Sequence, residues 1–382
     1  MTLRMITISA PVRRLAVSAS SVMALSGLLT AELSAQTGGT SIIPGGGSAV
    51  SRVATRGASF LELGVGARAL SLGGAFAATA NDLTATYWNV AGVADVQKTG
   101  ALLSYERLYG NSGLSNSFAA AGTPMFGGAA AVSIMSFSSG DIERTTENAP
   151  DGGDPTAGNF VEWRATAVGL HYARPFTDRL SFGVTAKYAV EGIQFATQNF
   201  KGADFGVRFR TGLFGSTFGA VIANLGSSGR MDGPALRRRL APRADAQFPT
   251  QRTVDAQLLA TAAQLPTTIR LGVQTDIFGT PESLYRQIGG AHRLTMFADL
   301  TDAVNTRQQS AFAAEYGLFN RFFVRGGKRF INDDRRDSKS HGLSVGAGIH
   351  IPVGSRRFVV DYAYRNVGEL QGNQAFSFQL GN

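Results

Sequence analysis

Apolar and polar residues alternate along most of the chain after Lys98, in runs of about 10 to 17 residues. In the run 180–191, for example, Leu180, Phe182 and Val184 lie on one face, and mostly polar or small residues fill the positions between them. Because successive side chains of a strand point to opposite faces, each run predicts a strand with one apolar face. We expect 14 strands, an even number typical of outer-membrane barrels, at residues 98–109, 113–124, 126–138, 160–174, 179–195, 201–212, 214–224, 265–278, 289–301, 308–319, 321–332, 341–353, 356–367 and 374–381.

The connections between these predicted strands differ in length in a regular way. Those after strands 2, 4, 6, 10 and 12 are tight, whereas long connections follow strands 3, 7 and 11, at residues 139–159, 225–264 and 332–340. Outer-membrane barrels sort their connections in this manner, and we expect every long one on the outer face. A soluble β-sandwich would give the same alternation along each strand, but it has no reason to sort its loops.

No segment after residue 36 reaches 18 uninterrupted apolar residues, so helical spans are not expected there. A closed barrel crosses lipid with every backbone group paired between strands. The sequence therefore predicts an all-β fold, a 14-stranded antiparallel transmembrane β-barrel over residues 98–382.

A short segment before the strands, residues 59–97, has a different pattern. Residues 67–80 are small, rich in glycine and extended in character, whereas residues 82–95 have helical spacing, with Asn81 or Asp82 at the N-cap position. We expect this segment to form a short helical plug inside the barrel.

The same segment also carries a family resemblance. The run Gly66–Phe76, the pair Asn81 and Asp82, and the run Tyr87–Gly92 closely resemble the N-terminal signature of the PorV/PorQ family of outer-membrane barrels, which are related to FadL-type fatty acid transporters. This chain has Val90 where the family usually has proline, so it gains a backbone N–H at that position. The last predicted hairpin resembles the family as well. The resemblance gives the plug candidates Asn81, Asp82, Tyr87, Trp88, Asn89 and Ala91.

The first 35 residues read as a signal peptide. Arg4, Arg13 and Arg14 form a positive region, residues 15–30 are mostly apolar, and cleavage is expected near Ala35. Residues 36–58 are rich in glycine and serine and predict a flexible lead-in. Together with the barrel pattern, this predicts the outer membrane of a Gram-negative-type bacterium.

Few residues are arranged for chemistry. The chain has no cysteine and four scattered histidines, so neither a metal nor a cofactor is expected. The run Gly64–Ala69 matches G-x-G-x-x-A, but no helix–strand alternation follows, and close backbone packing explains these glycines better. No serine lies in a G-x-S-x-G elbow. We expect a protein that is not an enzyme, since catalysis would need a facing Ser–His pair that the sequence does not reveal.

Charged side chains fall into two groups. Those at inward positions of the strands are expected to pair with one another across a polar lumen, and some of them to hold the plug. The second group is an arginine-rich loop between strands 7 and 8. It is either a solvated loop or a surface that contacts anionic glycolipid or an acidic protein, and it contains Arg230, Arg237, Arg238, Arg239 and Arg243. Residues 255–264 of the same loop predict a short helix. Nucleic acid is not expected as a partner, because aromatic and basic residues are not interleaved.

Two functions are consistent with these observations. The PorV/PorQ resemblance implies a component of a type IX secretion apparatus, which receives or shuttles secreted cargo proteins at the cell surface. The alternative is a FadL-like channel for hydrophobic small molecules such as fatty acids, with a pocket above the plug and an exit through a gap in the barrel wall. A purely structural or assembly role is a third, weaker hypothesis. One fold hosts many tasks, so the fold does not choose among them.

Overall fold

The computed structural model describes residues 55–146, 149–153, 159–193, 195–240, 254–286, 290–304, 306–331 and 342–381. The predicted signal peptide and most of the predicted lead-in lie outside the described residues. Within the described ranges, no helix has both the length and the apolar character needed to cross a membrane.

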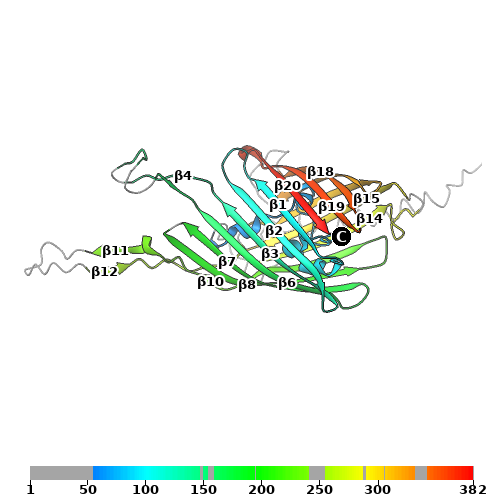
Figure 1. The fold of residues 1–382 in the computed structure, drawn as a ribbon, viewed down its shortest axis with the longest axis horizontal. Coiled ribbons are helices and arrows are strands. Elements are labelled where there is room, and N and C mark those ends of the chain that lie inside the picture. The colour runs from blue at the N-terminus through cyan, green and yellow to red at the C-terminus, as the bar shows by residue number, and fades with distance from the viewer. Residues whose placement is uncertain are drawn as a thin grey trace, which may run out of the picture. The chain divides into compact units, whose positions relative to one another are not determined.

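Fourteen antiparallel strands form one closed barrel, as the alternation predicted (Figure 1). Every strand pairs with the next one along the wall, and β1 pairs with β20 to close the circle, from Ala101 opposite Leu380 to Arg107 opposite Gln374. The wall strands are β1 (Gly100–Arg107), β2 (Ser115–Met125), β3 (Gly128–Ser138), β6 (Arg164–Pro175), β7 (Leu180–Ile193), β8 (Ala196–Arg210), β9 (Thr217–Gly226), β14 (Thr268–Phe278), β15 (His292–Ala303), β16 (Gln309–Leu318), β17 (Phe322–Ile331), β18 (Leu343–Val353), β19 (Arg356–Asn366) and β20 (Gly372–Gly381).

The two faces of the wall differ as the sequence pattern requires. In β7, Phe182, Val184 and Tyr188 point outward and are exposed, whereas Ser181 and Thr185, on the opposite face of the strand, are buried inside. Exposed apolar side chains recur on the outer face of the other strands, for example Leu103 in β1. An apolar surface of this extent is unfavourable in water, so the outer face requires a lipid environment.

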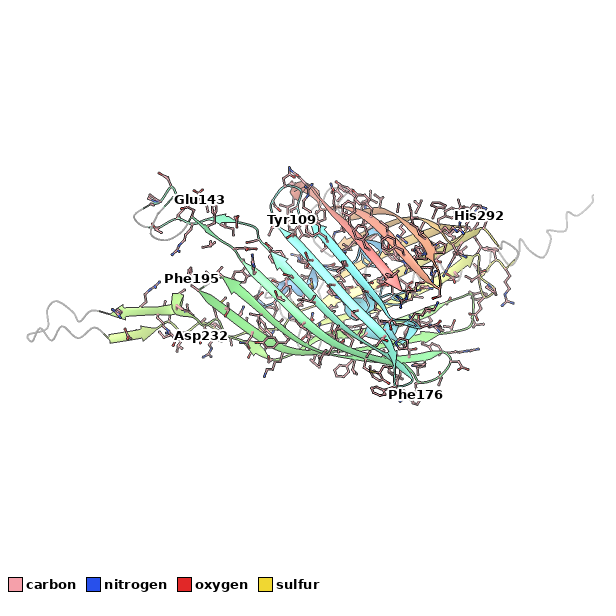
Figure 2. The ribbon with its side chains drawn as sticks, viewed as in Figure 1. Tyr109, Glu143, Phe176, Phe195, Asp232 and His292 are labelled. Atoms are coloured by element: carbon pink, nitrogen blue, oxygen red, sulfur yellow. The ribbon has the colours of Figure 1, made fainter. Side chains whose placement is uncertain are left out.

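Most long connections lie at one end of the barrel and most short ones at the other. The β2–β3, β6–β7, β8–β9, β16–β17 and β18–β19 connections are short and lie at one end, called here the turn end. The β3–β6, β9–β14 and β17–β18 connections are longer and lie at the other, the loop end. The expectation that every long connection lies at the loop end is wrong for residues 279–291, which join β14 to β15 at the turn end. Figure 2 shows Phe176 at the turn end, away from Glu143 and Phe195.

Small hairpins extend the wall at the loop end. They are β4 (Ile142–Glu143) with β5 (Phe160–Val161), β10 (Ser228–Gly229) with β13 (Ala263–Gln264), and β11 (Arg237–Leu240) with β12 (Val254–Gln257). The 3-10 helix η3 (Pro234–Leu236) directly precedes β11. The short helix predicted at 255–264 is wrong. The two ends of that segment are strands, because their backbone groups pair with β11 and β10.

Residues 59–97, for which the name plug is kept, contain four short helical elements: η1 (Ser59–Glu62), α2 (Ala67–Ser71), α3 (Ala85–Trp88) and η2 (Val90–Asp95). Two details of its predicted structure are wrong. The glycine-rich half is not extended, since it contains α2. The predicted helix over 82–95 is interrupted at Asn89, which has an extended backbone (φ −159°) because its side chain bonds to the backbone around it.

The plug segment crosses the lumen once. At its start, the Gly57 N–H donates to the Gln264 carbonyl and the Ala58 N–H to the Glu191 carboxylate, both near the loop end. At its other end, η2 leads to Lys98 and into β1, which begins at the turn end. The chain therefore enters the barrel at the loop end and leaves it at the turn end before the wall begins.

Candidate functional site

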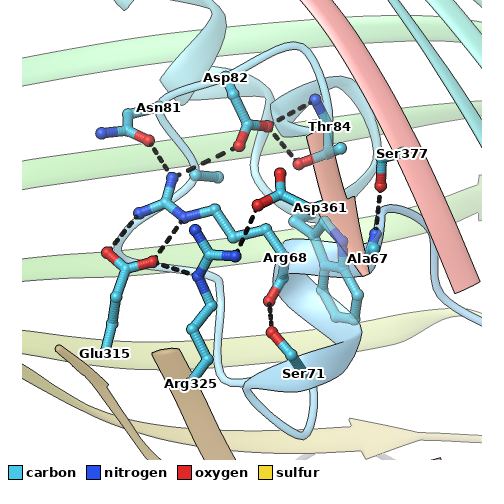
Figure 3. A network of polar contacts seen from close by, with 12 residues as sticks. Ala67, Arg68, Ser71, Asn81, Asp82, Thr84, Glu315, Arg325, Asp361 and Ser377 are labelled. Carbon is cyan, nitrogen blue, oxygen red and sulfur yellow. Dashed lines mark hydrogen bonds and ion pairs between the residues drawn. The ribbon is translucent and has the colours of Figure 1, made fainter. Parts of the chain in front are cut away.

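A buried network of charges joins the plug to the wall (Figure 3). Arg68 of α2 binds both carboxylate oxygens of Glu315 in β16, at 3.0 and 3.1 Å. Its third nitrogen bonds to Asn81 at 2.7 Å and to Asp82 at 3.4 Å. Arg325 of β17 then connects Glu315 to Asp361 of β19, with both distances 2.6 Å. The chain of charges fixes α2 against one side of the barrel.

The charge of Arg68 is secured by its partners. Burial disfavours the guanidinium, but the carboxylates of Glu315 and Asp82 outweigh burial and hold the pKa of Arg68 above its ordinary value. Arg68 therefore keeps the positive charge that Glu315 and Asp82 bind.

Wall side chains also bind the plug backbone directly. The Asp299 carboxylate accepts the N–H groups of Phe76 and Ala77 at 2.8 and 2.7 Å. Two arginines of the wall bind plug carbonyls: Arg208 donates to Ala80 at 3.0 Å, and Arg329 donates to Gly73 at 3.0 Å. These bonds satisfy backbone groups that the short helices leave unpaired.

Inward-facing glycines of the wall form a socket for the plug backbone. A Cβ added to any of them would lie no more than 3.0 Å from a plug atom, so a larger residue would require the plug or a neighbouring side chain to move. The glycine socket consists of Gly183 against Val90, Gly206 against Asn89, Gly219 against Ala77, Gly272 against Ala78, Gly327 against Leu72 and Gly346 against Ser71. It lies on several strands around the barrel, so the plug touches the wall on many sides.

The predicted plug residues lie at this interface in different ways. Asn81 is exposed at the turn end and binds Arg68, whereas Asp82 accepts from the Thr84 N–H at 2.8 Å. The buried Asn89 donates to the carbonyls of Ala77 in the plug, at 2.7 Å, and Val207 in β8, at 3.1 Å. Ala91 is buried and donates its N–H to the Asn89 side chain.

The two predicted aromatic residues hold the plug together. The Trp88 indole N–H donates to the Val65 carbonyl at 2.8 Å, and the Tyr87 hydroxyl donates to the Leu61 carbonyl at 2.8 Å. Burial raises the pKa of the Tyr87 hydroxyl, so it remains a donor. Arg270 of β14 lies over both rings, 4.9 Å from the Tyr87 centroid and 5.2 Å from that of Trp88.

The inward charges divide between the two roles expected for them. Pairs within the wall are Lys187 with Asp204, Arg293 with Asp276, Arg325 with Asp361 and Arg365 with Glu106. Others bind the plug, as Arg208 and Arg210 do with Asp95 at 2.5 and 2.6 Å. The sequence interpretation missed Glu315, Glu106 and the glycine socket. Their inward register along each strand was the only available signal.

Two cavities lie next to the plug. One, of about 40 Å³, is on its loop side between Tyr87, Trp88, Arg270 and Arg329, and has room for only a few water molecules. The other, of about 570 Å³, opens at the turn end. In the part of the chain that the structure describes, the first of these cavities is too small to hold an organic molecule.

A Ser–His pair of the kind that catalysis would need is present in the wall. The Ser133 hydroxyl and His171 Nε2 lie 2.8 Å apart, and His171 Nδ1 lies 2.9 Å from the Thr185 hydroxyl. The third group is a hydroxyl, whereas activated serines use a carboxylate or amide to orient the imidazole. The pair also lies outside both cavities, so we interpret it as a hydrogen-bonded row that satisfies polar groups in the wall.

The arginine-rich loop is exposed where it is described. Arg237, Arg238 and Arg239 lie on β11, and Arg230 precedes η3. Arg239 pairs with Asp255 at 3.6 Å, with both side chains more than 80% exposed, so that pair contributes little. Arg243 lies outside the described residues.

The fold is that of a known transporter. The crystal structure of the Ralstonia pickettii toluene transporter TbuX matches with a TM-score of 0.50 and 11% identity, over 83% of this chain and 98% of that one. The Pseudomonas putida toluene transporter TodX matches with 0.46 and 8%, over 83% and 96%. A Pseudomonas aeruginosa FadL homologue matches with 0.44 and 12%, over 80% and 95%. No protein-family model and no curated protein sequence matches the chain. At this identity, the likeness to TbuX shows a shared barrel fold.

Proposed function

We propose that this chain is an outer-membrane channel for hydrophobic small molecules, in which the plug must move before a molecule passes. The observation that carries the proposal is a plug that fills the lumen of a barrel with the fold of a toluene transporter. The plug is held by polar bonds, by glycine contacts and by an apolar cluster that it shares with wall residues such as Phe118, Met135 and Phe297, and its covalent connection to the wall is the short chain into β1. Such a plug can be displaced while the wall stays intact.

In this proposal, passage needs more room than the cavity next to the plug offers. The cavity on the loop side of the plug holds about 40 Å³, far less than the 300 to 1,000 Å³ of typical small-molecule sites. Neighbouring strands are hydrogen-bonded all around the wall, with register shifts between Ala203 and Phe205 in β8 and between Asp276 and Phe278 in β14. Displacing the plug is therefore the step that makes room.

A cross-link tests this step. The chain contains no cysteine, so the variant N81C/S355C carries only two, one on the plug and one on the β18–β19 turn, and both line the turn-end cavity. We expect cells with the barrel to take up a monoaromatic hydrocarbon faster than cells without it. A bismaleimide bridge between the two cysteines is expected to abolish that gain, while the S355C variant treated in the same way keeps it. Uptake that continues through the bridged barrel would argue against a moving plug.

A second candidate function is cargo handling in type IX secretion. Two observations favour it: the PorV/PorQ signature in the plug, and the exposed hairpins at the loop end, among them β11 with Arg237, Arg238 and Arg239. In this role the arginines would contact acidic cargo or anionic glycolipid. Deleting the gene is then expected to trap cargo proteins in the periplasm, while growth on hydrocarbons is unchanged. The reverse outcome favours the channel.

A further inference from the structure

The cavity at the turn end is the mouth of the lumen, closed from inside by the plug. It has a volume of about 570 Å³, within the range of small-molecule sites. Four separate segments meet there: the plug, the start of β1, the end of β8 and the β18–β19 turn. Its lining is polar and includes Asn81, Asp95, Gln97, Lys98, Arg210, Pro352, Gly354, Ser355, Arg356 and Arg357.

The charge of this turn-end pocket is one-sided. Four of its lining residues are basic, Lys98, Arg210, Arg356 and Arg357, and Asp95 is the single acidic residue among them. The Asp95 carboxylate is already bound to Arg208 and Arg210. Within the described ranges, Arg356 and Arg357 have no acidic partner, although they are adjacent at the start of β19.

We propose that the turn-end pocket binds a water-soluble small molecule that carries several negative charges, as phosphate or carboxylate groups. Like charges gathered in a recess attract an anion and raise its local concentration. A guanidinium group can bind two phosphate or carboxylate oxygens at once, and Lys98, whose ammonium donates to the Ser355 carbonyl, adds a further positive charge. A solute is favoured over a lipid headgroup because the plug residues Asn81 and Asp95 form part of the lining. The acyl chains of a lipid would have to cross the barrel rim to place a headgroup there.

The site does not depend on which molecule crosses the barrel. It lies on the opposite side of the plug from the small cavity next to Tyr87 and Trp88, and its lining is basic and not apolar. An anion in it would share Arg210 with Asp95, the last residue of η2. The end of the plug is therefore part of the site.

Calorimetry on the full chain in detergent at low salt tests the proposal, with sodium tripolyphosphate as the probe. We expect the wild type to bind it, and R356Q/R357Q to bind at least about tenfold more weakly, equal to about 1.4 kcal/mol. The control R237Q/R238Q removes the same charge from the exposed β11 hairpin at the loop end and is expected to stay within about twofold of the wild type. The variant R356K/R357K keeps the charge and is expected to retain most of the binding.

Three results would overturn the proposal. One is the absence of tripolyphosphate binding to the wild type. Another is an equal loss in R237Q/R238Q and R356Q/R357Q, which would show that only total charge matters. The third is displacement of the probe when the protein is moved into nanodiscs that contain anionic phospholipid, because a headgroup would then occupy the pocket. The gel mobility of unheated samples tests whether each variant is a folded barrel. Binding data from a variant that fails this test are not used.

Discussion

Single residues decide how firmly the plug is seated, and the most constrained of them carry charge. Glu315 is buried and bound by both Arg68 and Arg325. Removing its charge leaves two guanidinium groups buried with fewer partners, an arrangement that is costly in a medium of low polarity.

We therefore expect E315Q to lower the free energy of unfolding by about 3 to 5 kcal/mol. The measurement is denaturant unfolding of the barrel in detergent. As a control, R164Q breaks the ion pair of Arg164 with Glu162, in which the arginine is 75% exposed, and is expected to cost less than about 1 kcal/mol. Similar losses in both variants would mean that the buried network does not stabilise the protein.

The glycine socket offers a second test with a neighbouring control. In β17, a Cβ on Gly327 would meet the backbone of Leu72, while a Cβ on Gly326, on the other face of the strand, would meet nothing within 4 Å. We expect G327A to push α2 off the wall at a cost of about 1 to 3 kcal/mol and to make liposomes that contain the barrel more permeable to small solutes. G326A is expected to behave as the wild type. Equal permeability of the two variants would show that the socket does not seat the plug.

At the scale of elements, the strands could be predicted from sequence and the internal structure of the plug could not. Each strand separates lipid from lumen, so two different environments impose a period of two along its whole length, as in β7. The elements of the plug are four to six residues long, shorter than two helical turns, so no period develops. Asn89 interrupts the predicted helix through bonds to Ala77 and Val207, and the contact with Val207 forms only once the barrel is closed.

The candidate site was predicted in part for a related reason. The family signature pointed to Tyr87, Trp88 and Asn89; Trp88 and Asn89 are buried and Tyr87 is partly buried. Glu315 and Gly327 belong to distant strands that look like any others in the sequence. They matter because the strand register places them opposite α2. That register cannot be recognised from the residues next to them in the sequence.

The plug as an element is expected to seal the pore. Deleting residues 59–97 removes the chain that fills the lumen, and we expect the remaining barrel to pass small solutes in a liposome-swelling assay. Deleting residues 237–257, the β11–β12 hairpin, is the control, because that hairpin pairs with itself outside the wall and its loss should leave permeability unchanged. A tight barrel without its plug would show that the loops close the pore instead.

At the scale of the whole molecule, closure depends on the contact between the first and last strands. Phe378 of β20 points outward, 45% exposed, opposite Leu103 of β1 and Val360 of β19. F378S removes an apolar contact at this seam and is expected to reduce assembled barrel in the membrane several-fold, as measured by heat-modifiable mobility. The substitution F218S in β9, where Phe218 is also 45% exposed, is the control, and an equal loss there would reflect lost apolar surface in general.

The single passage of the plug through the lumen has a consequence for topology. An even number of strands alone would place the beginning and the end of the barrel on one side of the membrane. One additional passage makes the total odd, so residue 55 and residue 381 belong to opposite compartments, although β1 and β20 are neighbours in the wall. An impermeant label applied to intact cells should reach a cysteine at only one of these two positions, and opening the cells should expose the other.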